Sequence, residues 1–320
     1  MEQLCLQKNS NDLTQTITGN FNTTVNGDQN GSNNIGAQTI TGDSNYSLFK
    51  STGNWNTVTQ EATGDSNTLR TYQTGSVNTA SQTAGDGSIE SLRDKSYITQ
   101  IGNNNMVTST QQDHGWDGTL LNHYNYSNQY QNGNGNNSTV MQKGYMQSAT
   151  VTTNGNVNTA NIDQFNGNNT ASITQTGNNN WALSQNSARF NTNRITQMGN
   201  NNYAFARTTA GNSNKITVKQ LSGNSNISTT YVDGASNTVN ATQTGSLNIS
   251  GNNPYYSVGY GIDILGDGNT VNLRQTGNSN IAGQGVIGNN NTYNLTQTGN
   301  NNTSIQTVSG NGNNFIVTQH

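Results

Sequence analysis

The side chains whose types could support chemistry gather in one segment of the sequence. Asp113, His114, Asp117 and His123 are carboxylates and imidazoles, the groups that bind metal ions or transfer protons. Their spacing matches no strong ligand motif, and polar residues cluster by chance in a chain this rich in Asn. Cys5 is the one cysteine, which excludes an internal disulfide framework. We therefore expect no metal site, no cofactor and no catalytic residue, in a protein that is not an enzyme.

A second set of side chains suits recognition rather than reaction. Two segments are rich in aromatic residues, whose amphipathic rings can pack on sugars or on a partner protein. We take them as candidate ligand or partner contacts: Trp116, Tyr124, Tyr126 and Tyr130 in one segment, and Tyr255, Tyr256 and Tyr260 in the other. The alternative is that these rings cover a flank of the fold or form a subunit contact.

The composition limits the kind of fold that positions these residues. Of 320 residues, 28% are hydrophobic and 8% are charged, with a net charge of −3 and a single Pro. A thick globular core is not available, but the apolar residues recur at a strict period, which argues against disorder. With a weak negative net charge, the chain lacks the excess of basic residues that binding to nucleic acid requires. No apolar stretch approaches membrane-spanning length, so neither nucleic acid nor membrane insertion is expected.

An internal period decides the architecture. Glutamines recur at intervals of 22 or 23 residues in two blocks, namely Gln175, Gln197, Gln220 and Gln243, then Gln275, Gln297 and Gln319. Glycines mark half of this period, because they recur every 11 residues at Gly42, Gly53, Gly64 and Gly75. Each is followed by Asn, Asp or Ser, as tight turns require, and the runs between turns alternate as strands do. The sequence predicts an all-β fold, a flattened two-sheet β-solenoid with about 22 residues and two strands per turn.

Stacked turns place equivalent residues above one another at the strand spacing of about 4.8 Å. The repeated glutamines then form one inward amide ladder. The asparagines after each turn form another: Asn180, Asn202, Asn226, Asn248, Asn280 and Asn302. Each amide donates to the turn on one side and accepts from the other, which satisfies a buried polar group. We also expect a sheet of large residues to face a sheet of small ones, and end turns to be capped or joined to another chain.

Three segments lose the period, at about 86–97, 111–135 and 250–263. Insertions into a solenoid become loops on one side of the stack. The domain prediction is therefore an irregular N-terminal segment at 1–12, followed by a single β-solenoid at 13–320 that carries three loop insertions.

One recurring phrase gives the repeat a family resemblance. Gln-x-Gly-x-x-Asn-x-Ala occurs at 73–80, 175–182, 197–204 and 275–282, and it resembles the curlin repeat of bacterial curli fibre subunits. The resemblance covers about two-thirds of the chain. It implies a β-solenoid with a secreted, fibre-forming role, in which the Gln and Asn ladders are structural. The chain departs from that family in its missing signal peptide, its larger number of turns and its long insertions.

The expected function is that of a structural protein, a rigid fibre, spike or surface decoration. Because the polar start has no signal-peptide apolar region, we expect a protein made in a host cytoplasm and released by lysis as part of a virion, such as a phage. Residues 1–12 would suit attachment to a larger particle. The alternatives are a curli-type extracellular amyloid fibre or biofilm-matrix subunit, and a glycan-binding adhesin displayed on a solenoid. Expected partners are other structural proteins or copies of itself, in a homo-oligomer or fibre, and a cell-surface glycan.

Overall fold

The computed structural model describes residues 10–85, 93–112, 124–251 and 261–320. The chain divides into two compact units, unit 1 (residues 1–158) and unit 2 (residues 159–320). All regular elements of the described residues are β-strands, so none of them is a helix that could cross a membrane.

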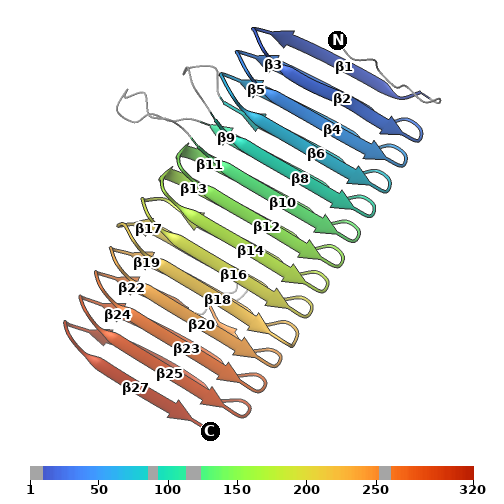
Figure 1. Ribbon diagram of the computed structural model, residues 1–320. Helices are drawn as coiled ribbons and strands as arrows, with labels where there is room; N and C mark the ends of the chain where they lie inside the picture. Colours follow the sequence, from blue (N-terminus) through green and yellow to red (C-terminus); the bar gives the residue numbers. More distant parts are fainter. Residues whose placement is uncertain (1–9, 86–92, 113–123, 252–260) are drawn as a thin grey trace. The chain divides into compact units, whose positions relative to one another are not determined.

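Unit 1 contains two parallel sheets, and each turn of the chain adds one strand to both (Figure 1). The odd sheet runs in the order β1 (Asp12–Thr18), β3 (Ile35–Thr41), β5 (Thr57–Thr63), β7 (Thr79–Ala84), β9 (Met106–Gln112) and β11 (Asn137–Tyr145). The even sheet runs in the order β2 (Thr23–Asn30), β4 (Tyr46–Thr52), β6 (Thr68–Thr74), β8 (Lys95–Ile101), β10 (Tyr126–Asn132) and β12 (Ser148–Asn154).

Unit 2 repeats this arrangement. Its odd sheet contains β13 (Thr159–Gly167), β15 (Trp181–Asn186), β17 (Tyr203–Ala210), β19 (Ile227–Asp233), β21 (Ile249–Ser250), β22 (Ile262–Leu265), β24 (Ile281–Ile287) and β26 (Thr303–Ser309). Its even sheet contains β14 (Thr170–Thr176), β16 (Thr192–Met198), β18 (Lys215–Leu221), β20 (Thr238–Thr244), β23 (Thr270–Thr276), β25 (Thr292–Thr298) and β27 (Asn314–Gln319). The predicted all-β, two-sheet solenoid is confirmed.

Strand alternation places the inward residues. In β16, every second residue is buried, namely Asn193, Ile195 and Gln197, and the residues between them face outward. The same alternation repeats one turn later in β18, where Ile216 and Val218 lie in register with Asn193 and Ile195. Each level therefore buries only a few side chains between the two sheets, and the core is a thin layer.

Size complementarity fills this layer in unit 1. Phe49 is fully buried, and it takes the space that side chains at two glycines would need. A Cβ atom on Gly27 would lie 2.3 Å from Phe49 Cζ, and one on Gly36 would lie 2.2 Å from the same atom. The large ring on β4 thus requires a position without a side chain on the facing strand β3, at Gly36, and another on the neighbouring strand β2 of its own sheet, at Gly27.

Two of the expected insertions are shorter than the sequence suggested. β8 begins at Lys95, inside the range 86–97, and β10 occupies Tyr126–Asn132, inside the range 111–135. The inward residues of β10 are Ser127, Gln129 and Gln131, so the strand has no apolar period from which it could be recognised.

The third insertion interrupts a strand rather than a turn. β21 and β22 lie at one level of the odd sheet, because both pair with β19 on one side and with β24 on the other. Residues 250 and 262–263 of the expected insertion therefore belong to strands. That residues 13–320 form one solenoid stays a prediction.

Candidate functional site

The inward glutamines of unit 2 form a continuous hydrogen-bonded ladder. Gln175 Nε2 donates to Gln197 Oε1 at 2.8 Å, and Gln197 Nε2 donates to Gln220 Oε1 at 2.9 Å. Bonds of 2.8–3.0 Å continue the ladder through Gln243, Gln275, Gln297 and Gln319. Gln197 Nε2 also donates to Trp181 O in the facing sheet at 2.9 Å. Each amide thus binds the next turn and ties the two sheets together.

The asparagine ladder of unit 2 runs in the opposite direction. The backbone N and Nδ2 of Asn202 donate to Asn180 Oδ1 at 3.0 and 3.1 Å, and Asn226 donates to Asn202 Oδ1 in the same way. Asn248 and Asn280 continue it. At Asn302 only the backbone N reaches Asn280 Oδ1, at 3.0 Å. Within the two ladders, the glutamines therefore donate toward the C-terminal end of the stack and the asparagines toward the N-terminal end. The asparagine Nδ2 groups also donate to glycine carbonyls of the next turn, as Asn226 does to Gly245 O at 2.7 Å.

Unit 1 contains equivalent ladders that the sequence analysis did not identify. In its even sheet, Gln73 Nε2 donates to Gln100 Oε1 at 2.9 Å, and Gln100 Nε2 donates to Gln131 Oε1 at 3.3 Å. These neighbours are 27 and 31 residues apart in the sequence, because insertions separate them. A search at a fixed period of 22 misses them, whereas the Gln-x-Gly phrase, which all three glutamines open, would have found them.

One ladder position in unit 1 holds a carboxyl group instead of an amide. Asp94 is fully buried in the column of Asn67 and Asn125, and its Oδ1 accepts the backbone N–H of Asn125 at 2.8 Å. Its Oδ2 has no hydrogen-bond partner among the described residues. Burial raises the pKa of Asp94 to about 7, and the hydrogen bonds from Asn125 oppose that rise. The protonated acid therefore suits this position better than the carboxylate.

Several predicted residues lie outside the described residues. These are the proposed acid–base group Asp113, His114, Asp117 and His123, the terminal Cys5, and the aromatic residues Trp116, Tyr255, Tyr256 and Tyr260. Within the ranges that the structure describes, no three His, Cys, Asp or Glu side chains gather as a metal site would require.

The remaining candidate contacts, Tyr124, Tyr126 and Tyr130, lie at and within β10. Tyr126 and Tyr130 face outward from this strand rather than from a loop. The Tyr126 ring lies 5.8 Å from that of Tyr97 on β8, and the Arg93 guanidinium lies 5.4 Å from the centre of the Tyr124 ring. Their role in recognition stays a prediction, but the structure joins them to aromatic residues that the sequence analysis left out.

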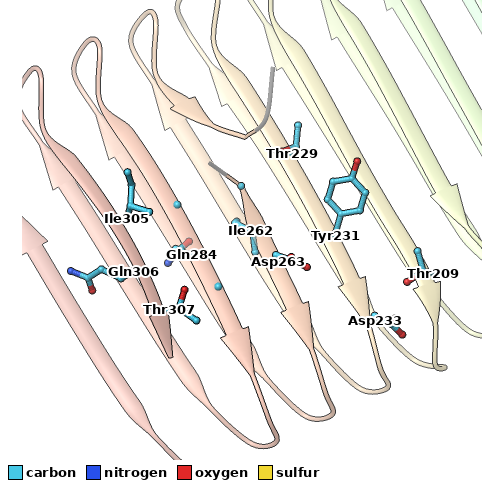
Figure 2. A pocket seen from close by; sticks show the side chains of 13 residues that line it. Thr209, Thr229, Tyr231, Asp233, Ile262, Asp263, Gln284, Ile305, Gln306 and Thr307 are labelled. Carbon is cyan, nitrogen blue, oxygen red and sulfur yellow. The ribbon is translucent and has the colours of Figure 1, made fainter. Parts of the chain in front are cut away.

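A shallow trough lies on the outer face of the odd sheet in unit 2 (Figure 2). Its volume is about 550 Å³, and strands β17, β19, β22, β24 and β26 contribute to its lining. The trough exists because Gly261, Gly283 and Gly285 place no side chain on this face.

The polar groups of this trough are hydroxyls, amides and two carboxylates. Tyr231 and Asp263 are partners in register on β19 and β22, and Figure 2 shows both among the residues that line the trough. Burial, followed by the charge of Asp233, raises the pKa of Asp263. Such groups can hydrogen-bond a polar ligand, and the described lining includes neither a histidine nor a cysteine.

Comparison with known families agrees with the repeat geometry. The family model of the curlin associated repeat matches residues 64–112 in unit 1, and residues 191–221 and 266–299 in unit 2. No curated protein is significantly similar to the chain. The matched segments contain parts of both amide ladders, including Gln197, Gln220 and Gln275.

Proposed function

We propose that this chain, which carries curlin associated repeats on a β-solenoid frame, is a non-enzymatic structural protein whose copies join end to end into an extracellular fibre. The repeat match and the two-sheet solenoid support a structural, fibre-like role. The observation that supports the joining step is that, within the described residues, β1 and β27 each pair along one edge only, which leaves an edge and part of a ladder without a neighbouring turn.

The C-terminal end offers both a strand edge and an amide donor. Gln319 Nε2 donates to Thr303 O at 3.0 Å, as Gln197 Nε2 does to Trp181 O. The second hydrogen of Gln197 goes to the next turn, whereas no described turn follows Gln319. The β27 side chains are also uncovered, since Ile316 is 68% exposed. This end is therefore suited to receive another turn of the same kind.

Among the described residues, β1 is also uncovered along its length. β1 pairs with β3 on one edge, and its residues are exposed or half-buried. Gln15 Nε2 donates to Gln38 Oε1 at 2.6 Å, so β1 already belongs to a ladder of the odd sheet. Strand addition between β1 of one copy and the C-terminal strands of another would extend both sheets by main-chain hydrogen bonds.

A proline in β27 tests this joining step. In β25, Thr292 N donates to Asn313 O on the C-terminal side. Asn314 of β27 is the partner of Thr292 in register. Along a strand of a parallel ladder, successive N–H groups point alternately to its two sides. The N–H groups of Asn314 and, two residues later, of Ile316 therefore point away from β25. Ile316→Pro therefore removes a free-edge donor without removing a bond within the chain. We expect Ile316→Pro to slow fibril formation at least tenfold, about the effect of 1.4 kcal/mol, while Ile316→Thr polymerises as the wild type does.

Electron microscopy and fibre diffraction provide the readout for this pair of variants. Fibrils should give the strand spacing of about 4.8 Å along their axis. A wild-type chain that remains monomeric at high concentration, or Ile316→Pro fibrils that grow at the wild-type rate, would contradict end-to-end joining.

A structural role is compatible with two biological settings, an extracellular fibre and a virion. We favour the extracellular fibre because the curlin associated repeat supports it. The virion setting, as a fibre, spike or surface decoration, stays a prediction from the sequence. Electron microscopy of the native source with an antibody to this chain separates the two, since label on free fibrils supports our proposal and label confined to particles overturns it.

A further inference from the structure

The even sheet of unit 1 carries an outward field of tyrosines and cations. The field consists of the outward residues of four neighbouring strands, β4, β6, β8 and β10 (Figure 1). At the first three outward positions of each strand lie Tyr46, Leu48, Lys50, Thr68, Arg70, Tyr72, Lys95, Tyr97, Thr99, Tyr126, Asn128 and Tyr130. We call this set the tyrosine face.

Ring and guanidinium groups follow one another across this face. The Arg70 guanidinium lies 4.9 Å from the centre of the Tyr46 ring and 5.6 Å from that of Tyr97. The Tyr97 ring in turn lies 5.8 Å from Tyr126. Aromatic residues thus occupy four successive strands, a stripe of about 14 Å at the strand spacing of about 4.8 Å.

The repeat itself does not require this arrangement. In unit 2, the outward residues of the even sheet are mainly threonine and asparagine, as in β20 with Thr238, Asn240 and Thr242. Cations such as Arg194 of β16 occur there, but β14, β16, β18, β20, β23 and β25 place no aromatic residue outward. The tyrosines are therefore a local feature, added to a frame that folds without them.

The face has unmatched positive charge. Lys50 pairs with Asp28 at 3.1 Å, but neither Arg70 nor Lys95 has an ion-pair partner within the described residues. Arg70 Nε is buried and lacks a hydrogen-bond partner there. Asp43 and Asp65, in the turns before β4 and β6, each accept a backbone N–H, at 2.6 and 2.7 Å.

The tyrosines remain accessible to a ligand. Tyr72 is 41% exposed and Tyr126 is 36% exposed. Next to them, two residues before β10, Tyr124 is 39% exposed, and the Arg93 guanidinium lies over its ring. Exposed rings that alternate with cations can cover the apolar faces of sugar rings while the cations bind acidic groups.

We propose that the tyrosine face binds an acidic polysaccharide, lying along the stripe from β4 to β10. Its pyranose rings pack on Tyr72, Tyr97 and Tyr126, and its carboxylate or sulfate groups bind Arg70 and Lys95. A repeating polymer fits the tyrosine face because the protein presents similar groups on each strand. A compact protein partner would not need this repetition. The proposal is independent of fibre formation, since it uses strand faces and leaves the terminal edges aside.

Binding to two polysaccharides tests this assignment. The probes are alginate, a polymer of uronic acids, and dextran, a neutral glucan, each measured by affinity electrophoresis or interferometry with the full chain. We expect alginate to bind and dextran not to bind, with affinity that falls as salt rises. Arg70→Ala and Tyr126→Ala should each weaken alginate binding about tenfold.

Matched variants in unit 2 serve as controls. Arg194→Ala removes a cation from the equivalent central position of β16, and Tyr203→Ala removes an outward ring from the odd sheet, where Tyr203 stacks on Trp181 at 4.3 Å. Both should bind alginate as the wild type does, and circular dichroism should show all four variants folded.

Four results would overturn the proposal. These are no binding of alginate, equal binding of alginate and dextran, equal losses in the unit 1 and unit 2 variants, and loss of self-association in Arg70→Ala or Tyr126→Ala without any polysaccharide. The last result would identify the tyrosine face as a lateral contact between copies of the chain.

Discussion

At the scale of one residue, a buried amide takes the place that an apolar side chain would have in a globular core. Gln197 is fully buried and bonds to Gln175, Gln220 and Trp181 O. An apolar residue at this position keeps the volume but leaves buried groups of the neighbouring turns without partners. A buried polar group without a partner costs more free energy than one hydrogen bond contributes to stability, so the ladder tolerates substitution poorly.

Replacement of Gln197 by Leu tests this reasoning. We expect Gln197→Leu to lower the free energy of unfolding by about 2–5 kcal/mol, because several buried donors and acceptors lose their partners together. Thr196→Ala, at the adjacent outward position, should change it by less than about 0.5 kcal/mol. Urea denaturation measures both. A Gln197→Leu variant as stable as the wild type would show that the amide ladder contributes little.

The carboxyl group of Asp94 makes stability depend on pH. Its pKa of about 7 in the folded chain exceeds the ordinary value of 3.8, so the folded state binds more protons than the unfolded state between these values. Its contribution to stability is fully present below about pH 4 and is lost as the pH rises to about 7. The total change is about 4 kcal/mol.

Asp94→Asn should remove this dependence, because an asparagine at this position remains neutral and matches Asn67 and Asn125 in the same column. We expect the variant to be more stable than the wild type at pH 8 and similar to it at pH 4, by chemical denaturation at each pH. Equal stabilities at pH 8 would mean that the carboxylate is solvated in the folded chain.

At the scale of the element, the turns rather than the strands demand particular residues. Gly199 has a φ of 111°, and a Cβ atom there would lie 1.9 Å from the carbonyl oxygen of Gly223 in the next turn. Gly312, in the last turn, also has a positive φ of 70°, but a Cβ atom there would meet nothing within 4 Å. The two glycines therefore separate the effect of backbone conformation from the effect of stacking.

Alanine substitution at these two glycines should give unequal losses. Gly312→Ala has only the conformational cost, about 1 kcal/mol. Gly199→Ala adds a clash with the backbone of the next turn, so we expect a clearly larger drop in stability and in melting temperature. Equal losses at both positions would argue against close contact between successive turns.

Strands could be predicted from the sequence where apolar residues alternate along them, and could not be predicted where this alternation is absent. The glutamine and asparagine spacings in unit 2, together with the glycine spacing in unit 1, were sufficient to predict two sheets and the inward glutamines and asparagines. β10 was missed because Ser127, Gln129 and Gln131 fill its inward positions. The split strand β21–β22 was missed because its two parts stand on either side of an insertion.

At the scale of the whole molecule, the type of fold follows from the sequence more fully than the arrangement of residues on the surface does. Inward residues follow the repeat, so their neighbours can be named from the period. The tyrosine face depends on the register across two insertions, which places Tyr72 beside Thr99 and Thr99 beside Tyr130. No fixed period relates these residues, so their grouping required coordinates.

The register of successive turns is the claim on which every ladder depends. Thr196, Lys219 and Thr242 occupy equivalent outward positions on β16, β18 and β20. Cysteines at two of these positions, in a Cys5→Ser background, allow nitroxide labels to report their separation by electron paramagnetic resonance. Neighbouring strands place the 196/219 pair about 5 Å apart at the backbone and the 196/242 pair about 10 Å apart.

We expect strong spin–spin broadening for the 196/219 pair and for the 219/242 pair, and clearly weaker broadening for the 196/242 pair. Absence of broadening at 196/219, or broadening as strong at 196/242, would contradict a stack in which each turn lies one strand spacing above the last.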